Sequence, residues 1–235
     1  MIISGIQKCT TLDFPQHLSC IVFTPGCNMR CHFCHNPEFV LPQKIREIKN
    51  SFIPEQIFFT FLESRKNLLE GVVITGGEPT LMVDLLDFIS KIKKMGFKVK
   101  LDSNGLRPDI FKKIIEDNLV DYIAMDVKAS LEQYKKLTGS RVDVNKIKES
   151  IDLLKSQKNV LYEFRTTMIK DIHTQKEMLA IADLIQGGSQ LHLQTFRPGN
   201  TLNPLFATYV GYRAEEMNQF AQLMRPFVSH VSIRI

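Results

Sequence analysis

Short apolar runs alternate with amphipathic stretches along most of the chain. Apolar and β-branched residues gather in six short runs, and such runs predict buried strands. The predicted strands are residues 20–24, 72–75, 97–102, 122–126, 160–165 and 191–194. Between these runs, segments such as 85–95, 110–118 and 177–185 place apolar residues at helical spacing. Alternating strands and helices are typical of right-handed βα crossovers and a parallel sheet.

The number of strands limits the shape of that sheet. An alternating run at 228–235 adds a candidate seventh strand, while 187–189 and 197–204 carry the glycine, proline and asparagine of loops. Because six or seven strands are fewer than the eight of a closed barrel, we predict an α/β fold: a partial (β/α)6 TIM-like barrel, open at one side. Nothing marks a domain boundary, so residues 1–235 are expected to form a single domain.

Polar side chains stand at the ends of the predicted strands. The carboxyl ends of parallel strands meet at one rim of a barrel, where active sites lie. One polar strand end would mean little, since every strand gives way to a loop, but six in register favour a convergent site. The six residues are Thr24, Thr75, Asp102, Asp126, Arg165 and Gln194.

Composition excludes several classes of protein. A hydrophobic fraction of 44% and a charged fraction of 23% are typical of a globular protein. The formal net charge of +5 is spread along the chain, and basic runs such as 91–94 fit solvated helix faces, so we expect no nucleic-acid partner. No apolar run approaches the roughly 20 residues that cross a bilayer, and the N-terminus lacks a secretory pattern. We therefore expect a cytoplasmic protein without a membrane partner.

Three of the five cysteines lie together directly after the first predicted strand. Cys27, Cys31 and Cys34 have the spacing C-x3-C-x2-C, and their position puts them on the rim described above. Thiolates suit iron in a cluster, and these steps allow one loop to hold three corners of a cubane. The fourth iron would then be a Lewis-acid position open to a small molecule.

The cysteines could also serve in a zinc site, in core packing or in disulfides. A zinc site completed by His32 or His35 fits the same loop. Cys20 falls within the first predicted strand, where a cysteine is expected to be buried in packing, and Cys9 lies outside the loop. The five cysteines do not form a disulfide framework.

The cysteine loop and a second motif together resemble the radical S-adenosylmethionine (SAM) superfamily. Phe33 precedes the last cysteine of the loop, and "TGGEPTL" at 75–81 follows the second predicted strand. The resemblance covers nearly the whole chain and implies one radical SAM domain over 1–235. It further implies a [4Fe–4S] cluster on Cys27, Cys31 and Cys34, with the amino and carboxylate groups of SAM on the fourth iron.

The same resemblance implies which side chains contact SAM. Glycines of the "TGGEP" turn lack a Cβ and let backbone groups approach the methionyl amine, and an Asp-x-Lys pair and two arginines offer charges to the amine and carboxylate. The aspartate and lysine of that pair also fit a purely structural ion pair. The implied set is Phe33, Gly76, Gly77, Glu78, Asp102, Ser103, Asn104, Asp126, Lys128, Arg165 and Arg197.

Within that superfamily, the N-terminal stretch is similar to the activating enzymes of glycyl-radical proteins. The matching residues are "SGIQKCTTLDFPQHLSCIVFTPGCNMRCHFCHNPE" at 4–38 and the Asp-x-Lys pair at 126–128. The activase of anaerobic ribonucleoside-triphosphate reductase is the most similar type. One departure is Arg197, which stands where the pyruvate formate-lyase activase carries a SAM-contacting histidine. Residues 35–71 contain no cysteine, so a single cluster is expected.

This resemblance implies a reaction and leaves alternatives. One electron from reduced flavodoxin or ferredoxin enters the cluster, SAM is cleaved to methionine and a 5′-deoxyadenosyl radical, and the radical removes a Cα hydrogen from a glycine of the partner enzyme. The first alternative is a radical SAM enzyme acting on a small molecule, of the 7-carboxy-7-deazaguanine synthase type. A zinc-binding interaction module without catalysis is the second, and it leaves the "TGGEP" turn and the Asp-x-Lys pair without a purpose.

Overall fold

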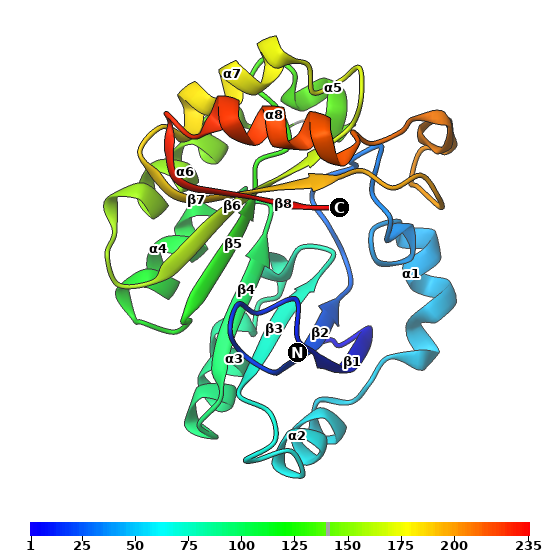
Figure 1. The fold of residues 1–235 in the computed structure, drawn as a ribbon. Coiled ribbons are helices and arrows are strands. Elements are labelled where there is room, and N and C mark those ends of the chain that lie inside the picture. The colour runs from blue at the N-terminus through cyan, green and yellow to red at the C-terminus, as the bar shows by residue number, and fades with distance from the viewer. Residues whose placement is uncertain (140–141) are drawn as a thin grey trace.

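One curved sheet runs through the molecule. The computed structural model describes residues 1–139 and 142–235. Its eight strands lie in chain order: β1 (Gly5–Thr10), β2 (Ser19–Thr24), β3 (Gly71–Gly76), β4 (Lys98–Ser103), β5 (Tyr122–Asp126), β6 (Leu161–Met168), β7 (Gly188–Thr195) and β8 (Val228–Arg234). β1 is antiparallel to β2, and every later strand is parallel to the one before it. β1 and β8 are the two edges, so the barrel is open between them (Figure 1).

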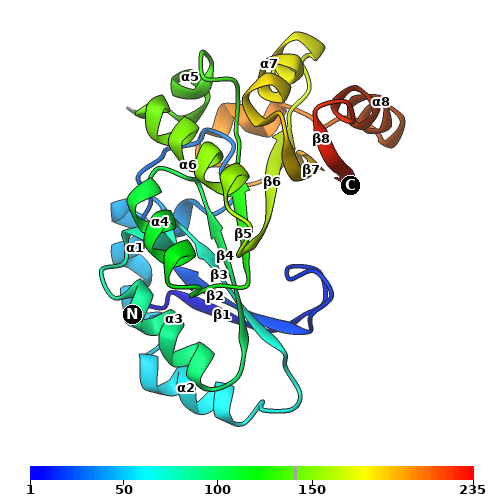
Figure 2. The same ribbon diagram turned by 90° about the vertical axis from the view of Figure 1, so that its left-hand side faces the viewer.

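Helices cover the outer face of the sheet (Figure 2). They are α1 (Pro42–Ile48), α2 (Glu55–Glu63), α3 (Leu85–Lys94), α4 (Pro108–Glu116), α5 (Tyr134–Thr138), α6 (Val144–Ser156), α7 (Gln175–Ile185) and α8 (Ala214–Met224). At least one helix follows each strand from β2 to β7, which confirms the predicted six βα units and the open barrel. Among the described residues, no helix combines the length and the apolar character needed to span a membrane.

Residue alternation along the strands sorts side chains between two faces. In β5, Ile123 and Met125 are fully buried in the large core that the helices share. Tyr122 points to the opposite face, where it packs with Phe14 and Val73 in a second and much smaller cluster. Successive side chains of a strand point to opposite faces, so one short sequence supplies both layers.

The strands agree with the sequence pattern at most positions. All six predicted strands and the candidate seventh are present, and β1 adds a strand at the N-terminal edge of the sheet. The expectation of a loop at 187–189 is wrong in part, because β7 already begins at Gly188. A Cβ at Gly188 would lie 2.9 Å from the Phe164 ring, so this glycine allows a close approach of two strands rather than a turn.

Candidate functional site

A cavity of about 280 Å³ lies at the carboxyl ends of the parallel strands. All but one of the residues that the resemblance assigns to the site line it: the three loop cysteines, Phe33, the two glycines and Glu78 of the "TGGEP" turn, and the polar residues in the carboxyl-terminal halves of β4, β5 and β6 and directly after β4 and β5. The exception is Arg197. Of the other predicted strand-end residues, Thr75 and Gln194 line the cavity and Thr24 does not, and the cavity adds Met29, Asn36, Val40 and Thr167, which were not predicted.

Backbone hydrogen bonds hold the cysteine loop from three sides. The amide of Arg30 donates to the carbonyl of Thr138, the last residue of α5, at 2.8 Å. On another side, Leu202 N donates to Cys34 O at 2.9 Å, from the segment that follows β7. From the turn after β3, Glu78 N donates to Gly26 O at 2.7 Å. The loop thus has a fixed conformation although it is not a regular element.

Burial governs the chemistry of the three thiols. Desolvation raises the pKa of Cys27 to about 11 and that of Cys31 to about 12, and it also raises the pKa of Cys34. The nearby Lys128 ammonium acts in the opposite direction on all three. A metal binds the thiolate, so iron entering this loop has to displace three protons.

The two loop histidines face away from such a centre. His32 Nδ1 lies 3.1 Å from Asn203 Nδ2, and its ring stacks on Phe206. His35 Nε2 donates to the carbonyl oxygen of Arg197 at 2.7 Å. In residues 1–139 and 142–235, no three His, Cys, Asp or Glu side chains are grouped as ligands of a single metal ion. This arrangement gives no support to a zinc site, whereas the ligands of a cubane are spread over separate irons.

The glycines of the "TGGEP" turn are required by packing. Gly76 has φ +113°, and a Cβ there would lie 2.4 Å from Thr24 N. A Cβ at Gly77 would lie 2.0 Å from Gly26 O. Each distance is far inside van der Waals contact, so any larger residue would push the turn away from the cysteine loop. The turn and the loop are therefore built as one unit.

Glu78 ties this unit to the end of β4. Its carboxylate is 1% exposed and accepts hydrogen bonds from Thr80 N, Thr80 Oγ1, Ser103 Oγ and Asn104 N, at 2.6 to 3.1 Å. Burial raises the pKa of Glu78, and these four donors oppose that rise. Asn104 Nδ2 continues the network to Asn28 Oδ1 at 2.8 Å. These side chains hold the two rim segments together as well as lining the cavity.

A ladder of alternating charges crosses the floor of the cavity. Arg165 bridges two carboxylates, with Nη1 2.8 Å from Asp102 Oδ2 and Nε 2.9 Å from Asp126 Oδ1. Lys100 continues the ladder beyond Asp102, and Lys128 Nζ lies 3.1 Å from Asp126 Oδ2. The buried carboxylate of Glu163 interacts with Lys100 and Arg165 as a third anion, so the group is close to neutral and offers a ligand both cationic donors and a carboxylate acceptor.

The ladder fixes the charge state of its members. Burial alone would raise the pKa of Asp126, but Arg165 and Lys128 lower it to about 2. For Lys128, burial opposes the charge and Asp126 more than compensates, so its pKa lies above the usual value. Lys128 Nζ also lies 5.7 Å from the centre of the Phe33 ring, a cation–π distance. Asp126 and Lys128 are therefore an ion pair that faces the cavity.

Two buried residues that support this lysine were not predicted. His173 Nε2 donates to Lys128 O at 3.0 Å, while its Nδ1 accepts from Ile169 N at 3.0 Å. Burial lowers the pKa of His173, so the ring is neutral with one donor and one acceptor in use. Tyr134 OH contacts Lys128 N and Asp126 O, each at 3.2 Å. Neither residue belongs to a sequence motif, so only the fold reveals their role.

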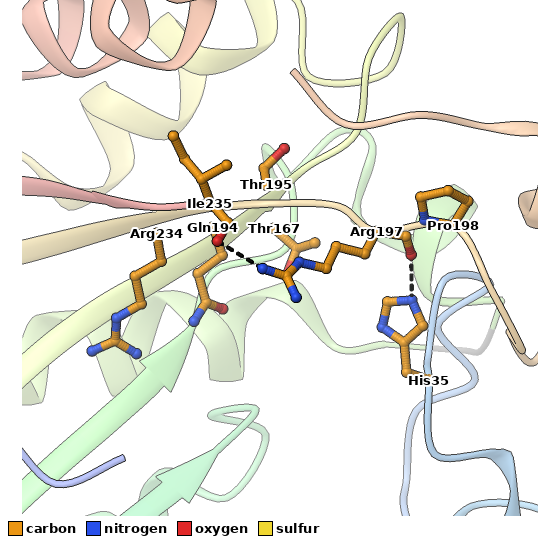
Figure 3. A pocket seen from close by; sticks show the side chains of 8 residues that line it. All are labelled: His35, Thr167, Gln194, Thr195, Arg197, Pro198, Arg234 and Ile235. Atoms are coloured by element: carbon orange, nitrogen blue, oxygen red, sulfur yellow. Dashed lines mark hydrogen bonds between the residues drawn. The ribbon is translucent and has the colours of Figure 1, made fainter. Parts of the chain in front are cut away.

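Arg197 lies in a neighbouring cleft, shown in Figure 3, which shares Thr167 and Gln194 with the cysteine cavity. Its guanidinium donates to Ile235 O at 2.8 Å. Contact between Arg197 and SAM remains a prediction, and in this geometry Arg165 is the nearer candidate for a carboxylate in the cysteine cavity.

Comparisons with known proteins agree with these features. A model of the radical SAM superfamily matches residues 21–185. A Methanocaldococcus jannaschii protein, provisionally named a glycyl-radical enzyme activating enzyme, is 33% identical over 240 residues, which cover 99% of this chain and 95% of that protein. The pyruvate formate-lyase-activating enzyme of Listeria monocytogenes is 31% identical over 147 residues, covering 58% of this chain and 57% of that enzyme.

A solved structure has a fold similar to that of this chain. Streptococcus suis SuiB, bound to its precursor peptide SuiA, aligns with a TM-score of 0.63 at 14% identity, covering 92% of this chain and 48% of SuiB. At that identity the likeness concerns the fold alone. The chain belongs to the radical SAM superfamily, and within it to the group of proteins named as glycyl-radical enzyme activating enzymes.

Proposed function

We propose that this protein is a radical SAM activase, which cleaves SAM reductively and generates a glycyl radical on a partner enzyme. The observation that carries the proposal is the convergence of three cysteines, the "TGGEP" turn and the Asp-x-Lys pair on one cavity. It occurs in a chain that matches a protein named as such an activase over nearly its full length. The proposed domain is the whole of 1–235, in the cytoplasm.

The residues that line the cavity fit the [4Fe–4S] cluster that membership of the superfamily implies. Cys27, Cys31 and Cys34 would hold three irons of a [4Fe–4S] cluster, since all three thiols line the cavity. Bound there, the cluster and SAM supply reductive cleavage of a sulfonium and abstraction of hydrogen from carbon. Asn104 Nδ2, which lies 3.8 Å from Cys27 Sγ, would offer a weak hydrogen bond to a ligand sulfur.

The charge ladder would orient SAM. Lys128 and Arg165 are candidate donors to the methionyl carboxylate, and Asp126 is an acceptor for the amine. Asp102, Ser103 and Phe33 are the proposed contacts to the adenosine part of SAM. Gly76, Gly77, Glu78 and Asn104 would act by holding the rim in the conformation that SAM needs.

The proposed substrate is a glycine of a partner protein. Glycine has no Cβ to block the approach to its Cα, and its radical is delocalised over two flanking amides. The gap between β1 and β8 leaves one side of the barrel open, where a partner's loop could enter. We propose anaerobic ribonucleoside-triphosphate reductase as the partner and flavodoxin or ferredoxin as the electron donor. No nucleic-acid or membrane partner is part of the proposal.

The test begins with anaerobic reconstitution of the protein with iron and sulfide. We expect about four irons and four sulfides per chain and SAM-dependent formation of 5′-deoxyadenosine under reducing conditions. With an anaerobic ribonucleotide reductase from the same source, a carbon-centred doublet should appear in the EPR spectrum of the partner. If SAM is consumed without a doublet on any glycyl-radical partner, a small-molecule substrate of the 7-carboxy-7-deazaguanine type becomes the better proposal.

A further inference from the structure

A second cleft, of about 440 Å³, adjoins the cysteine cavity at the β8 edge of the barrel. Arg197 and Arg234 contribute two guanidinium groups to it, and Gln194, Thr167 and Thr195 contribute neutral hydrogen-bonding groups. In Figure 3 the guanidinium of Arg197 points toward Gln194 and the last residue of the chain, with Arg234 on the other side of Gln194. Apart from Arg197, which the resemblance places among the SAM contacts, none of these residues belongs to the implied SAM set.

One row of the sheet connects the two cavities. Thr167 of β6 pairs with Gln194 of β7, and Gln194 pairs with Arg234 of β8. In parallel strands, paired residues present their side chains to the same face, so all three point into the barrel. Thr167 and Gln194 line both cavities, whereas Arg234 lines only the outer one. Neighbouring strands are about 4.8 Å apart, so the row places Arg234 roughly 10 Å from Thr167.

Neither of the two arginines is paired with an acidic side chain. Within the described ranges 1–139 and 142–235, no aspartate or glutamate side chain lies within ion-pair distance of either guanidinium, and none lines the cleft. Arg197 donates to an oxygen of Ile235, the last residue of the chain, so its guanidinium is engaged in part, whereas the Arg234 guanidinium has no acceptor among the described residues. A guanidinium has five N–H donors in a planar fork, and carboxylates match that geometry in pairs.

The cysteine loop braces this cleft. His35, which directly follows Cys34, donates to the carbonyl oxygen of Arg197 and stacks on Phe196, with ring centres 5.4 Å apart. The backbone that carries Arg197 is thereby fixed relative to the proposed cluster loop. An anion in the cleft would accordingly be held at a defined place beside the cavity where SAM is proposed to bind.

We propose that this cleft binds the carboxylate of an aspartate or glutamate in the substrate polypeptide, close to the target glycine. The proposal rests on the proposed function and specifies its substrate. An extended chain advances about 3.3 Å per residue, so a glycine at the Thr167 end of the row puts the acidic residue roughly three positions away. The proposal commits to a carboxylate and not a phosphate because the lining of the cleft includes no start of a helix, where phosphates are commonly bound.

The first experiment measures carboxylate binding directly. Reconstituted, SAM-loaded protein is titrated with N-acetyl-aspartate methylamide, its asparagine analogue and inorganic phosphate, and the arginine Nε–H NMR signals are followed. We expect saturable shifts with the aspartate compound only, and a loss of affinity of about tenfold or more in Arg234→Gln and Arg197→Gln. Arg225→Gln, an exposed arginine on the far end of α8, is the matched control and should bind as the unmodified protein does.

Three outcomes of that titration would overturn the proposal. They are the absence of saturable binding, tighter binding of phosphate than of the aspartate compound, and saturable binding of the aspartate compound only when the protein is prepared without SAM. The last result would assign Arg197 and Arg234 to the cofactor.

A second experiment separates this proposal from the proposed function. Heptapeptides with a central Cα-deuterated glycine carry one aspartate at each flanking position in turn, and an all-asparagine peptide is the control. We expect deuterium in 5′-deoxyadenosine, with a KM at least tenfold lower for aspartate about three positions from the glycine, and loss of that preference in Arg234→Gln. Equal KM values for all peptides would refute the carboxylate site. If no peptide transfers deuterium although the aspartate compound binds, the glycine substrate is refuted and the anion site stands.

Discussion

The outer and inner faces of the same strands are built from different chemistry. On the outer face, residues such as Leu101, Ile123 and Phe164 are fully buried against the helices. On the inner face, their direct neighbours Asp102 and Arg165 belong to the charge ladder. Apolar residues occupy the inner face mainly on the β2 and β3 side, in the small cluster of Ile21, Val73, Phe14 and Tyr122.

This difference separates the work of stabilising the fold from that of binding a ligand. The outer layer removes a large apolar area from water, which is the main favourable contribution to folding. The inner charges are desolvated, and their mutual attraction does little more than offset that cost, so they add little net stability. We infer that substitutions on the outer face change stability and that substitutions on the inner face change ligand binding.

The cysteines give the largest expected effect. Replacing Cys27, Cys31 or Cys34 with alanine should abolish cluster assembly and SAM cleavage, because each thiolate is proposed to hold a separate iron. Cys20, on the outer face, and Cys9, exposed on β1, should be replaceable without loss of iron. Iron and sulfide content and the yield of 5′-deoxyadenosine check this. An intact four-iron cluster in Cys31→Ala would refute the assignment.

An outer-face truncation should act on stability alone. Leu101 is fully buried, so Leu101→Ala should lower the free energy of unfolding by about 2 to 5 kcal/mol through the lost apolar contact and the cavity left behind. SAM affinity, measured at a temperature where the variant is folded, should stay unchanged. A large fall in SAM affinity of the folded variant would mean that the two faces are coupled.

Inner-face substitutions should do the reverse. Asp126→Asn and Lys128→Met should weaken SAM binding by about 1.5 to 3 kcal/mol, roughly tenfold to a hundredfold, while iron content is preserved. The matched controls are Asp87→Asn and Lys94→Met on the exposed side of α3. Isothermal titration with SAM measures the effect. Unchanged affinity in both inner variants would make the pair a purely structural one.

The smallest effect should come from replacing His173, whose ring donates to the backbone carbonyl of Lys128. The folded state lowers the pKa of His173 because burial disfavours its charged form. The unfolded chain therefore binds more protons as the pH falls, so the stability from neutral His173 is present above about pH 6.5 and declines below it. Between pH 7.5 and 5.5, the melting temperature should fall more in the unmodified protein than in His173→Gln. Parallel curves for the two proteins would exclude this contribution.

Much of the fold could be predicted because the signal was local. Apolar strand runs, amphipathic helices and the spacing of Cys27, Cys31 and Cys34 are visible in short windows of sequence. The inward charges also have a local signal: Lys100 and Asp102 in β4 alternate with buried apolar residues, which is unusual in a strand that helices cover. The Glu163 and Arg165 pair in β6 shows the same pattern.

The remaining features depend on contacts between distant segments. His173 and Tyr134 act through the backbone beside Lys128, and only the fold brings these segments together. The packing role of Gly77 follows from Gly26, which is 51 positions away, and a motif alone suggests an open approach for a ligand instead. The resemblance places Arg197 among the SAM contacts, but the direction of its side chain depends on the segment that follows β7 and on Ile235.

The most direct test of the account follows one hydrogen atom. Reconstituted and reduced protein is mixed with SAM and an anaerobic ribonucleotide reductase from the same source, whose glycines carry deuterium at Cα. If a protein glycine is the substrate, mass spectrometry should find one deuterium in each 5′-deoxyadenosine formed in the first turnover, in step with the EPR doublet on the partner. Unlabelled 5′-deoxyadenosine formed at the same rate, with SAM consumed and no doublet, would contradict the account.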